Sequence, residues 1–389
     1  MADTKYISQR LDELMSRLDR LEERVYSATD RDRTEGQEVT SAGIQYCAMP
    51  PRPQRDFGLD VSADRAAAIL ALGGKWVNKT NLHYYLSDSG RFSGNSAQRD
   101  VVREAFDVWK DVGIGLTFTE VSVLSESELR IGFLHGAGSW SRIGTDALNA
   151  GQQEPTMNFG WNINVQGPNG LDTAIHEIGH ALGFHHEHQN PNAGIVWDHE
   201  AVYDHFARTQ SPPWDRDKTD HNILDKLDPH TVGGSDWDPD SIMHYSFEAG
   251  LIVQPERYRP GLTPQPGLSE SDKEIVRFFY PDEGSGSVIP QLKPWESQLL
   301  SLGPGEQKDF NILPEQTRDY DFRTFGDSDT VMVLFEEDNG DFRYVKGDDD
   351  SGYNRNASFR VRLLRGHTYQ LRIRLYFSFS SGDTAVMMW

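Results

Sequence analysis

The first apolar pattern along the chain is a heptad seam within residues 1–30. Its members alternate in steps of four and three positions, and they are Ile7, Leu11, Leu14, Leu18, Leu21 and Val25. Asp, Glu and Arg fill most positions between them, so residues 6–25 are predicted to form an amphipathic helix. About three heptads is the lower limit for a coiled coil. Two interpretations therefore stand: self-association through this helix, or one helix packed on its own protein.

The pattern becomes polar and irregular at residues 31–73, which indicates a linker or a pro-segment. From about residue 74 it becomes globular. The segment at residues 96–110 carries an apolar helical stripe, and Asn95 or Ser96 would cap that helix. A further helix is expected over residues 172–182. Strands are predicted at residues 76–86, 114–118, 129–133 and 156–161. This order predicts an α/β (α+β) domain at residues 74–283, with a helix packed under a mixed sheet.

The rest of the domain offers weaker patterns. A helix is expected at residues 198–207, and a second at 269–279, where Ser269 and Asp272 form a capping-box pattern. Residues 211–240 are rich in Pro, Asp and Gly and are expected to be irregular. The run DEGSGSV at residues 282–288 predicts a linker.

Only strand patterns follow this linker. They are at residues 331–335, 359–364 and 369–375, separated by turn signals such as Asn339-Gly340 and Gly347-Asp348. Residues 289–389 are therefore predicted to form a small all-β sandwich.

Charge and cysteine content narrow the function classes. The 389 residues include 60 Asp and Glu against 38 Lys and Arg, a formal net charge of −22. This balance argues against nucleic acid or an anionic membrane as the main partner. There is one cysteine, so no intramolecular disulfide can form. No apolar run reaches the roughly 18 residues of a membrane span, and the N-terminus has no apolar signal core.

The strongest chemical signal is the pattern H-E-x-x-H-x-x-G-x-x-H at residues 176–186. His176 and His180 are four residues apart, so they lie on one helix face and can share one zinc ion. Gly183 would end the helix and let His186 supply a third ligand. Glu177 would lie beside the metal and act as general base toward its water. Three protein ligands leave one position open, which is typical of catalytic rather than structural zinc.

This motif is specific. With 35 Gly and 13 His in the chain, chance would supply both added positions with probability about 0.003. The alternative, a polar helix with solvated histidines, is correspondingly disfavoured. Cys47 lies upstream, and a thiolate is a good zinc ligand. It could cap the metal and keep an enzyme latent, or it could be an ordinary cysteine.

These residues resemble the metzincin clan of metallopeptidases. The run GFHHEHQNP after the helix, the pentapeptide SIMHY at residues 241–245 and the segment GLSESDKEIVRFFYP resemble the astacin family within that clan. The resemblance covers about residues 74–281. It implies that Met243 forms a floor under the metal and that Tyr245 can ligate zinc or stabilise the oxyanion. It also implies an extracellular enzyme, although animal astacins carry two disulfides that this chain cannot form.

Residues 291–389 resemble the bacterial pre-peptidase C-terminal domain through Asp327-x-Asp329, residues 348–350 and Gly366-x-Thr368-Tyr369. The acidic run Asp348-Asp349-Asp350 offers oxygen ligands for Ca²⁺, but a solvated turn is the favoured interpretation.

The sequence thus predicts a zinc metalloendopeptidase in which Glu177 assists attack of a zinc-bound water on the peptide bonds of proteins. Two alternatives remain: a latent or inactive protease scaffold that acts as a binding or adhesion protein, and a zinc hydrolase with non-peptide substrates.

Overall fold

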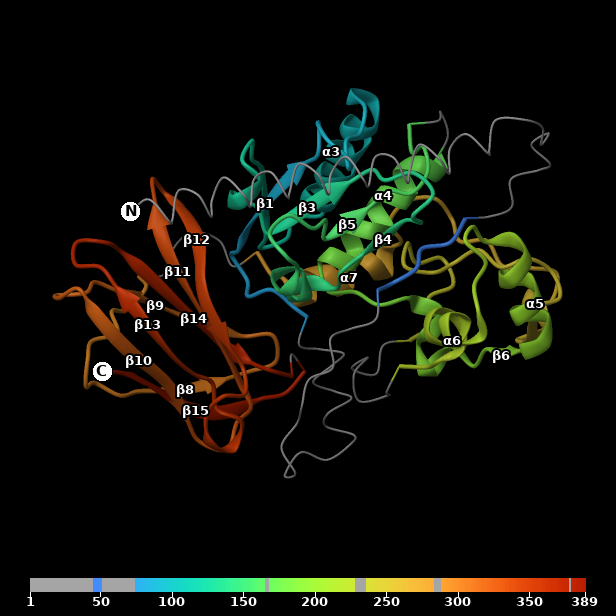
Figure 1. Cartoon of the computed structure of the whole chain (residues 1–389). Coiled ribbons are helices and arrows are strands. Elements are labelled where there is room, and N and C mark those ends of the chain that lie inside the picture. Colours follow the sequence, from blue (N-terminus) through green and yellow to red (C-terminus); the bar gives the residue numbers. More distant parts are fainter. Residues whose placement is uncertain (1–44, 51–73, 165–167, 228–235, 283–287, 378) are drawn as a thin grey trace, which may run out of the picture. The chain divides into compact units, whose positions relative to one another are not determined.

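The computed structural model describes residues 45–50, 74–164, 168–227, 236–282, 288–377 and 379–389 (Figure 1). The predicted helix at residues 6–25 lies outside the described residues. Within the described part of the chain, no helix is both long enough and apolar enough to cross a membrane.

A five-stranded mixed sheet organises the first half of the described chain. Its strand order is β2-β1-β3-β5-β4, and β4 runs antiparallel to β5 at the sheet edge while the other pairs are parallel. The strands are β1 (Asn81–Leu86), β2 (Thr117–Glu120), β3 (Leu129–Gly132), β4 (Trp140–Ser141) and β5 (Met157–Asn158). The predicted mixed sheet is confirmed. The two-residue β4 was not predicted, because so short a strand has no alternation to detect.

Helices α3 (Ser96–Asp111) and α4 (Pro168–Ala181) pack against each other beside this sheet (Figure 1). Asn95 caps α3 as predicted, since its side chain accepts from the Gln98 backbone and the Gln98 side chain accepts in return. The apolar stripe of α3 is buried, and the indole of Trp109 donates to the carbonyl of Ile175 in α4 at 3.0 Å. These contacts fix the position of α4, which carries the histidine motif.

The remaining helices of this half lie after the motif. They are α5 (His199–Thr209), α6 (Arg216–Thr219) and α7 (Glu270–Phe279), and a two-stranded ladder joins β6 (Val196–Trp197) to β7 (Ile252–Gln254). The capping box of Ser269 and Asp272 begins α7 as predicted. The expectation that residues 211–240 are irregular is wrong in part. Asp215 caps α6, and one π-helical turn follows at Asp220–Leu224.

The C-terminal part forms two four-stranded antiparallel sheets, as predicted for a sandwich. Their orders are β13-β10-β15-β8 and β12-β11-β14-β9. The strands are β8 (Gln298–Leu302), β9 (Gln307–Ile312), β10 (Arg318–Phe325), β11 (Thr330–Asp338), β12 (Asp341–Asp348), β13 (Ser358–Leu363), β14 (Tyr369–Leu375) and β15 (Gly382–Met388).

The two turn signals proposed for this sandwich differ in outcome. Asn339 and Gly340 both have positive φ and join β11 to β12, as expected for a two-residue hairpin. Gly347 does not start a turn, because it pairs with Val333 inside the ladder. The turn follows Asp348, whose carboxylate accepts from the backbone of Ser351 and Ser358.

The sandwich contacts the segment that leads into β1. Arg374 donates to the carbonyl of Lys75 at 2.9 Å, and Arg372 donates to that of Asn78 at 3.1 Å. Gln307 both accepts from the Asn78 backbone N–H and donates to its carbonyl. Further along, the buried His83 of β1 bridges Glu128 and Asp341. These bonds hold the start of the peptidase-like half against the sandwich.

Candidate metal centre

Helix α4 presents His176 and His180 on one face, and the chain reverses immediately after them. Gly183 has a φ of +98°, which favours glycine. Its N–H donates to the His180 carbonyl at 2.8 Å, and the Phe184 N–H donates to that of Gly179 at 3.1 Å. These two bonds form a Schellman motif. The predicted glycine stop is therefore present, and it brings His186 back toward the helix.

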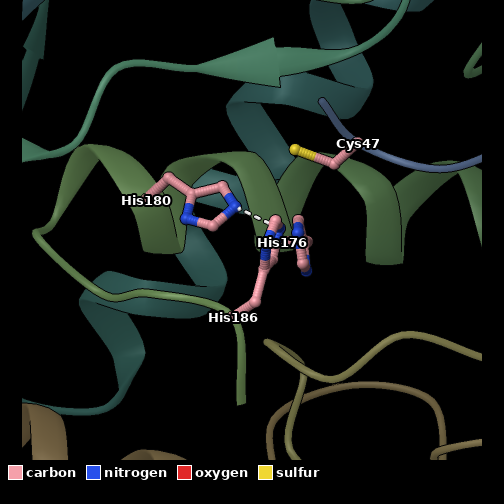
Figure 2. Close-up of side chains that lie close together, drawn as sticks. All are labelled: Cys47, His176, His180 and His186. Carbon is pink, nitrogen blue, oxygen red and sulfur yellow. Dashed lines mark hydrogen bonds between the residues drawn. The ribbon is translucent and has the colours of Figure 1, made fainter. Parts of the chain in front are cut away.

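The three imidazoles meet through their Nε2 edges (Figure 2). His176 Nδ1 lies 2.7 Å from the Ile242 carbonyl, and His180 Nδ1 lies 2.7 Å from that of Phe184. A carbonyl can only accept, so each Nδ1 carries the proton and each Nε2 presents a lone pair. His180 Nε2 lies 3.0 Å from His186 Nε2, and His176 Nε2 is buried with no protein partner among the described residues.

A fourth side chain joins them. One ligand atom from each of Cys47, His176, His180 and His186 lies within 4.8 Å of all the others, and all four residues are buried (Figure 2). His176 and His180 each present an Nε2 lone pair to this cluster, and a cation there would accept both lone pairs. Burial lowers the pKa of His176 to about 4 and keeps those of His180 and His186 well below their usual range. Neutral imidazoles are the form that binds metal, so the donor set fits a metal ion.

Glu177 lies beside this cluster and is fully buried. Its Oε2 is 3.4 Å from the Cys47 sulfur, and its Oε1 has no hydrogen-bond partner within the described chain. Burial raises the pKa of Glu177 to about 8, and the hydrogen bond to Cys47 opposes this shift. Burial and the Glu177 carboxylate in turn hold the pKa of the Cys47 thiol well above its usual range. Burial therefore favours the neutral, protonated form of both groups.

The SIMHY turn lies under the histidines. Met243 packs so closely on Gly179 of α4 that a Cβ there would lie 2.4 Å from the methionine sulfur. The Tyr245 ring is 4.3 Å from that of His186, and its hydroxyl donates to the Cys47 carbonyl at 2.6 Å. The need for glycine at position 179, inside the H-E-x-x-H motif, was not predicted, because its neighbour is 64 residues away in the sequence.

A carboxylate from α7 holds this turn in place. Asp272 Oδ1 accepts from the Ser241 hydroxyl at 2.6 Å, and its Oδ2 accepts from the Ile242 N–H at 2.8 Å. The Ile242 carbonyl is the group that orients His176. The capping pattern of residues 269–272 had suggested only a helix start, so the link from Asp272 to the metal centre was missed.

The segment at residues 45–50 packs against the histidine cluster through Cys47. The Ala48 N–H donates to the Ser139 carbonyl next to edge strand β4 at 3.0 Å, and the Met49 N–H donates to the Asn222 side chain at 2.9 Å. Tyr46 and Met49 are buried with the core of the α5 region. This segment therefore occupies the edge of the sheet where an extended peptide would add.

Comparison with known proteins agrees with this geometry. The matrixin family model matches residues 75–196. Protein SpAN of Strongylocentrotus purpuratus is 30% identical over 201 residues, which cover 48% of this chain and 29% of that protein. The chain spans only about a third of the length of the curated relatives it matches.

Among solved structures, that of myroilysin is 32% identical and covers 54% of this chain and 97% of its own, with a TM-score of 0.48. The pre-peptidase C-terminal domain of a collagenase from Bacillus anthracis is 13% identical and covers 28% of this chain and 100% of its own, with a TM-score of 0.24. Residues 75–196 therefore belong to a matrixin-type metzincin domain.

Proposed function

We propose that this protein is a zinc-dependent endopeptidase that Cys47 holds in a latent state. The proposal rests on one observation: three buried imidazoles and the Cys47 thiol present one donor atom each around a common point beside the buried Glu177. His176, His180 and His186 would hold the zinc, and Cys47 would be a fourth ligand. Bound zinc would polarise the scissile carbonyl and acidify a water or the Cys47 thiol.

The residues around this point suit peptide hydrolysis. Glu177, when ionised, would take a proton from the attacking water and then pass it to the leaving amine. The Tyr245 hydroxyl now donates to a carbonyl oxygen, that of Cys47. After the segment leaves, the same hydroxyl would be free to donate to the substrate oxygen as negative charge develops. Edge strand β4 would align the substrate through main-chain hydrogen bonds.

Latency would follow from the positions of Cys47 and residues 45–50. If Cys47 were bound to the zinc, it would take the place of the attacking water, and residues 45–50 would block the edge strand. The relatives and the resemblance also support an enzyme that acts outside the cell on protein substrates, and we extend the proposal to that site of action.

Peptidase activity of the full-length chain on a denatured protein tests this proposal. We expect little activity in the native chain, a large gain in Cys47→Ser, and none in Cys47→Ser combined with Glu177→Ala or with a zinc chelator. X-ray absorption at the zinc edge gives an independent readout, with one sulfur neighbour in the native chain and none in Cys47→Ser.

Two results would contradict the proposal. Equal activity of the native chain and Cys47→Ser, without a sulfur neighbour on zinc, would exclude latency through Cys47. No activity in any variant, at one zinc per chain, would favour the binding-protein alternative.

A further inference from the structure

The ring of Tyr46 fills an aromatic pocket beside the metal centre. Its centroid lies 4.8 Å from that of Phe206, 5.2 Å from Tyr245 and 6.2 Å from Phe247, and the side chain is buried. The contacts with Phe206 and Tyr245 are edge-to-face, the geometry that aromatic pairs prefer. We call this space, lined by His205, Phe206, Tyr245 and Phe247, the Tyr46 pocket.

The lining of this pocket is supported from behind. Trp214 stacks on Phe206 at 5.0 Å, and Trp197 contacts Phe247 at 4.7 Å. Phe206 belongs to α5, Trp197 to β6, and Phe247 follows the SIMHY turn. Because these rings pack against one another, Phe206 and Phe247 do not depend on Tyr46 for their positions. The pocket would therefore persist after residues 45–50 leave the cleft.

The pocket is also fixed relative to the reacting groups. Tyr46 directly precedes Cys47, whose thiol lies among the histidines. Tyr245 forms the wall between them, since its ring contacts both Tyr46 and His186. One residue along an extended chain spans about 3.3 Å. A substrate whose scissile carbonyl took the place of the Cys47 thiol would thus lie close to this pocket. The side chain of a residue next to the scissile bond would then enter it.

We infer that the Tyr46 pocket selects substrates with an aromatic residue next to the scissile bond, and that Tyr46 imitates that residue in the latent chain. The inference rests on the proposed peptidase function.

The chemistry of the pocket also predicts which substrate side chains bind best. The Tyr46 hydroxyl is buried without a hydrogen-bond partner in the described residues, and an unpaired buried hydroxyl is unfavourable. Phenylalanine should therefore bind at least as well as tyrosine. The Glu248 carboxylate lies 3.8 Å from Nδ1 of His205, which lines the pocket, so acidic side chains should be excluded.

Cleavage mapping tests the inference on the full-length chain. The enzyme is Cys47→Ser combined with Tyr46→Ala, in which neither the thiol nor the ring competes with substrate. The substrate is a mixture of peptides from a digested proteome, with cleavage sites read by mass spectrometry. We expect Phe, Tyr and Trp to be enriched at one fixed position adjacent to the cleaved bond, and Asp and Glu to be depleted there.

A matched peptide pair gives the magnitude. Two peptides that differ only by Phe or Ala at that position should differ at least about tenfold in kcat/KM, since an aromatic ring buries a large apolar surface. Cleavage with equal rates for the pair, or without aromatic enrichment, overturns this inference and leaves the peptidase proposal intact. No cleavage of any peptide refutes the peptidase proposal itself.

Competition between Tyr46 and the substrate side chain for the Tyr46 pocket provides a second test. In the Cys47→Ser background, Tyr46→Ala should raise activity several-fold because the segment loses its anchor, whereas Tyr46→Phe should leave it equal or lower. Gln45→Ala is the matched control, because Gln45 is exposed in the same segment. Equal activity of the Ala and Phe variants, each with one zinc per chain, would contradict occupation of the pocket by Tyr46.

Discussion

Asp272 is expected to support the metal centre from a distance. Its carboxylate accepts three hydrogen bonds, from the Ser241 hydroxyl, the Ile242 N–H and the Ser269 N–H. Each bond to a buried charged group contributes at least about 1.5 kcal/mol. Asp272→Ala removes all three, so we expect a loss of about 4 kcal/mol in the free energy of unfolding. For a domain of this size, that loss lowers Tm by about 8–16 °C.

The same variant should weaken metal binding, because the Ile242 carbonyl orients His176. Removal of such an outer partner typically reduces metal affinity by about 10–100-fold. Asp272→Asn is a graded variant. Its amide oxygen can still accept from the two N–H groups while its NH₂ faces the Ser241 hydroxyl, so we expect a loss of only about 1–2 kcal/mol.

Thermal unfolding and competition for zinc with a chromophoric chelator measure both effects. Glu270→Ala is the control, since Glu270 lies in the same helical turn but is exposed and forms a surface ion pair with Lys273. The reasoning fails if Asp272→Ala and Glu270→Ala have the same Tm and the same zinc affinity.

Three further predictions concern proton transfer and pH. In the Cys47→Ser background, Glu177→Gln should lower kcat by about 10²–10⁴-fold with zinc content unchanged; retained activity would exclude Glu177 as general base. Tyr245→Phe should lower kcat about 10²-fold or more with little change in KM, and a change confined to KM would exclude the oxyanion role. Burial lowers the pKa of His83, but the hydrogen bonds and charges of Glu128 and Asp341 outweigh it and raise the pKa above 6.5. Protonated His83 therefore stabilises the fold fully below about pH 6.5, and this contribution is lost as pH rises through the higher folded pKa. The Tm difference between the native chain and His83→Gln should shrink as the pH rises above about 6.5, whereas a constant difference would contradict the argument.

The parts of the fold that local patterns dictate could be predicted from the sequence. The four-residue spacing of His176 and His180 predicted that they lie on one helix face. Gly183 predicted the end of the helix, because its positive φ depends on the local backbone alone. The capping residues Asn95 and Ser269 marked two helix starts. In each case the interacting atoms are within about five residues, so a short window of sequence contains the cause.

The parts that long-range packing dictates could not be predicted. The bond between His176 and the Ile242 carbonyl joins residues 66 positions apart. The position of Tyr46 depends on Phe206 and Phe247, which lie on α5 and after the SIMHY turn. Residues 216–224 form helical turns although their composition favours a loop, since Asp215 caps the first turn and Asn222 and Ile223 are buried. Tertiary contacts decided these elements, and no window of sequence reveals such contacts.

The arginines of β14 also bear on maturation. Arg372 and Arg374 hold the carbonyls of Asn78 and Lys75, and Lys79 forms an ion pair with Asp309 of β9. A processing cut directly before Gly74 would create a new chain end next to this clamped stretch. The sandwich would then anchor that new end through Arg372, Arg374 and Asp309. Removal of the sandwich should accordingly harm the processed form more than the intact chain.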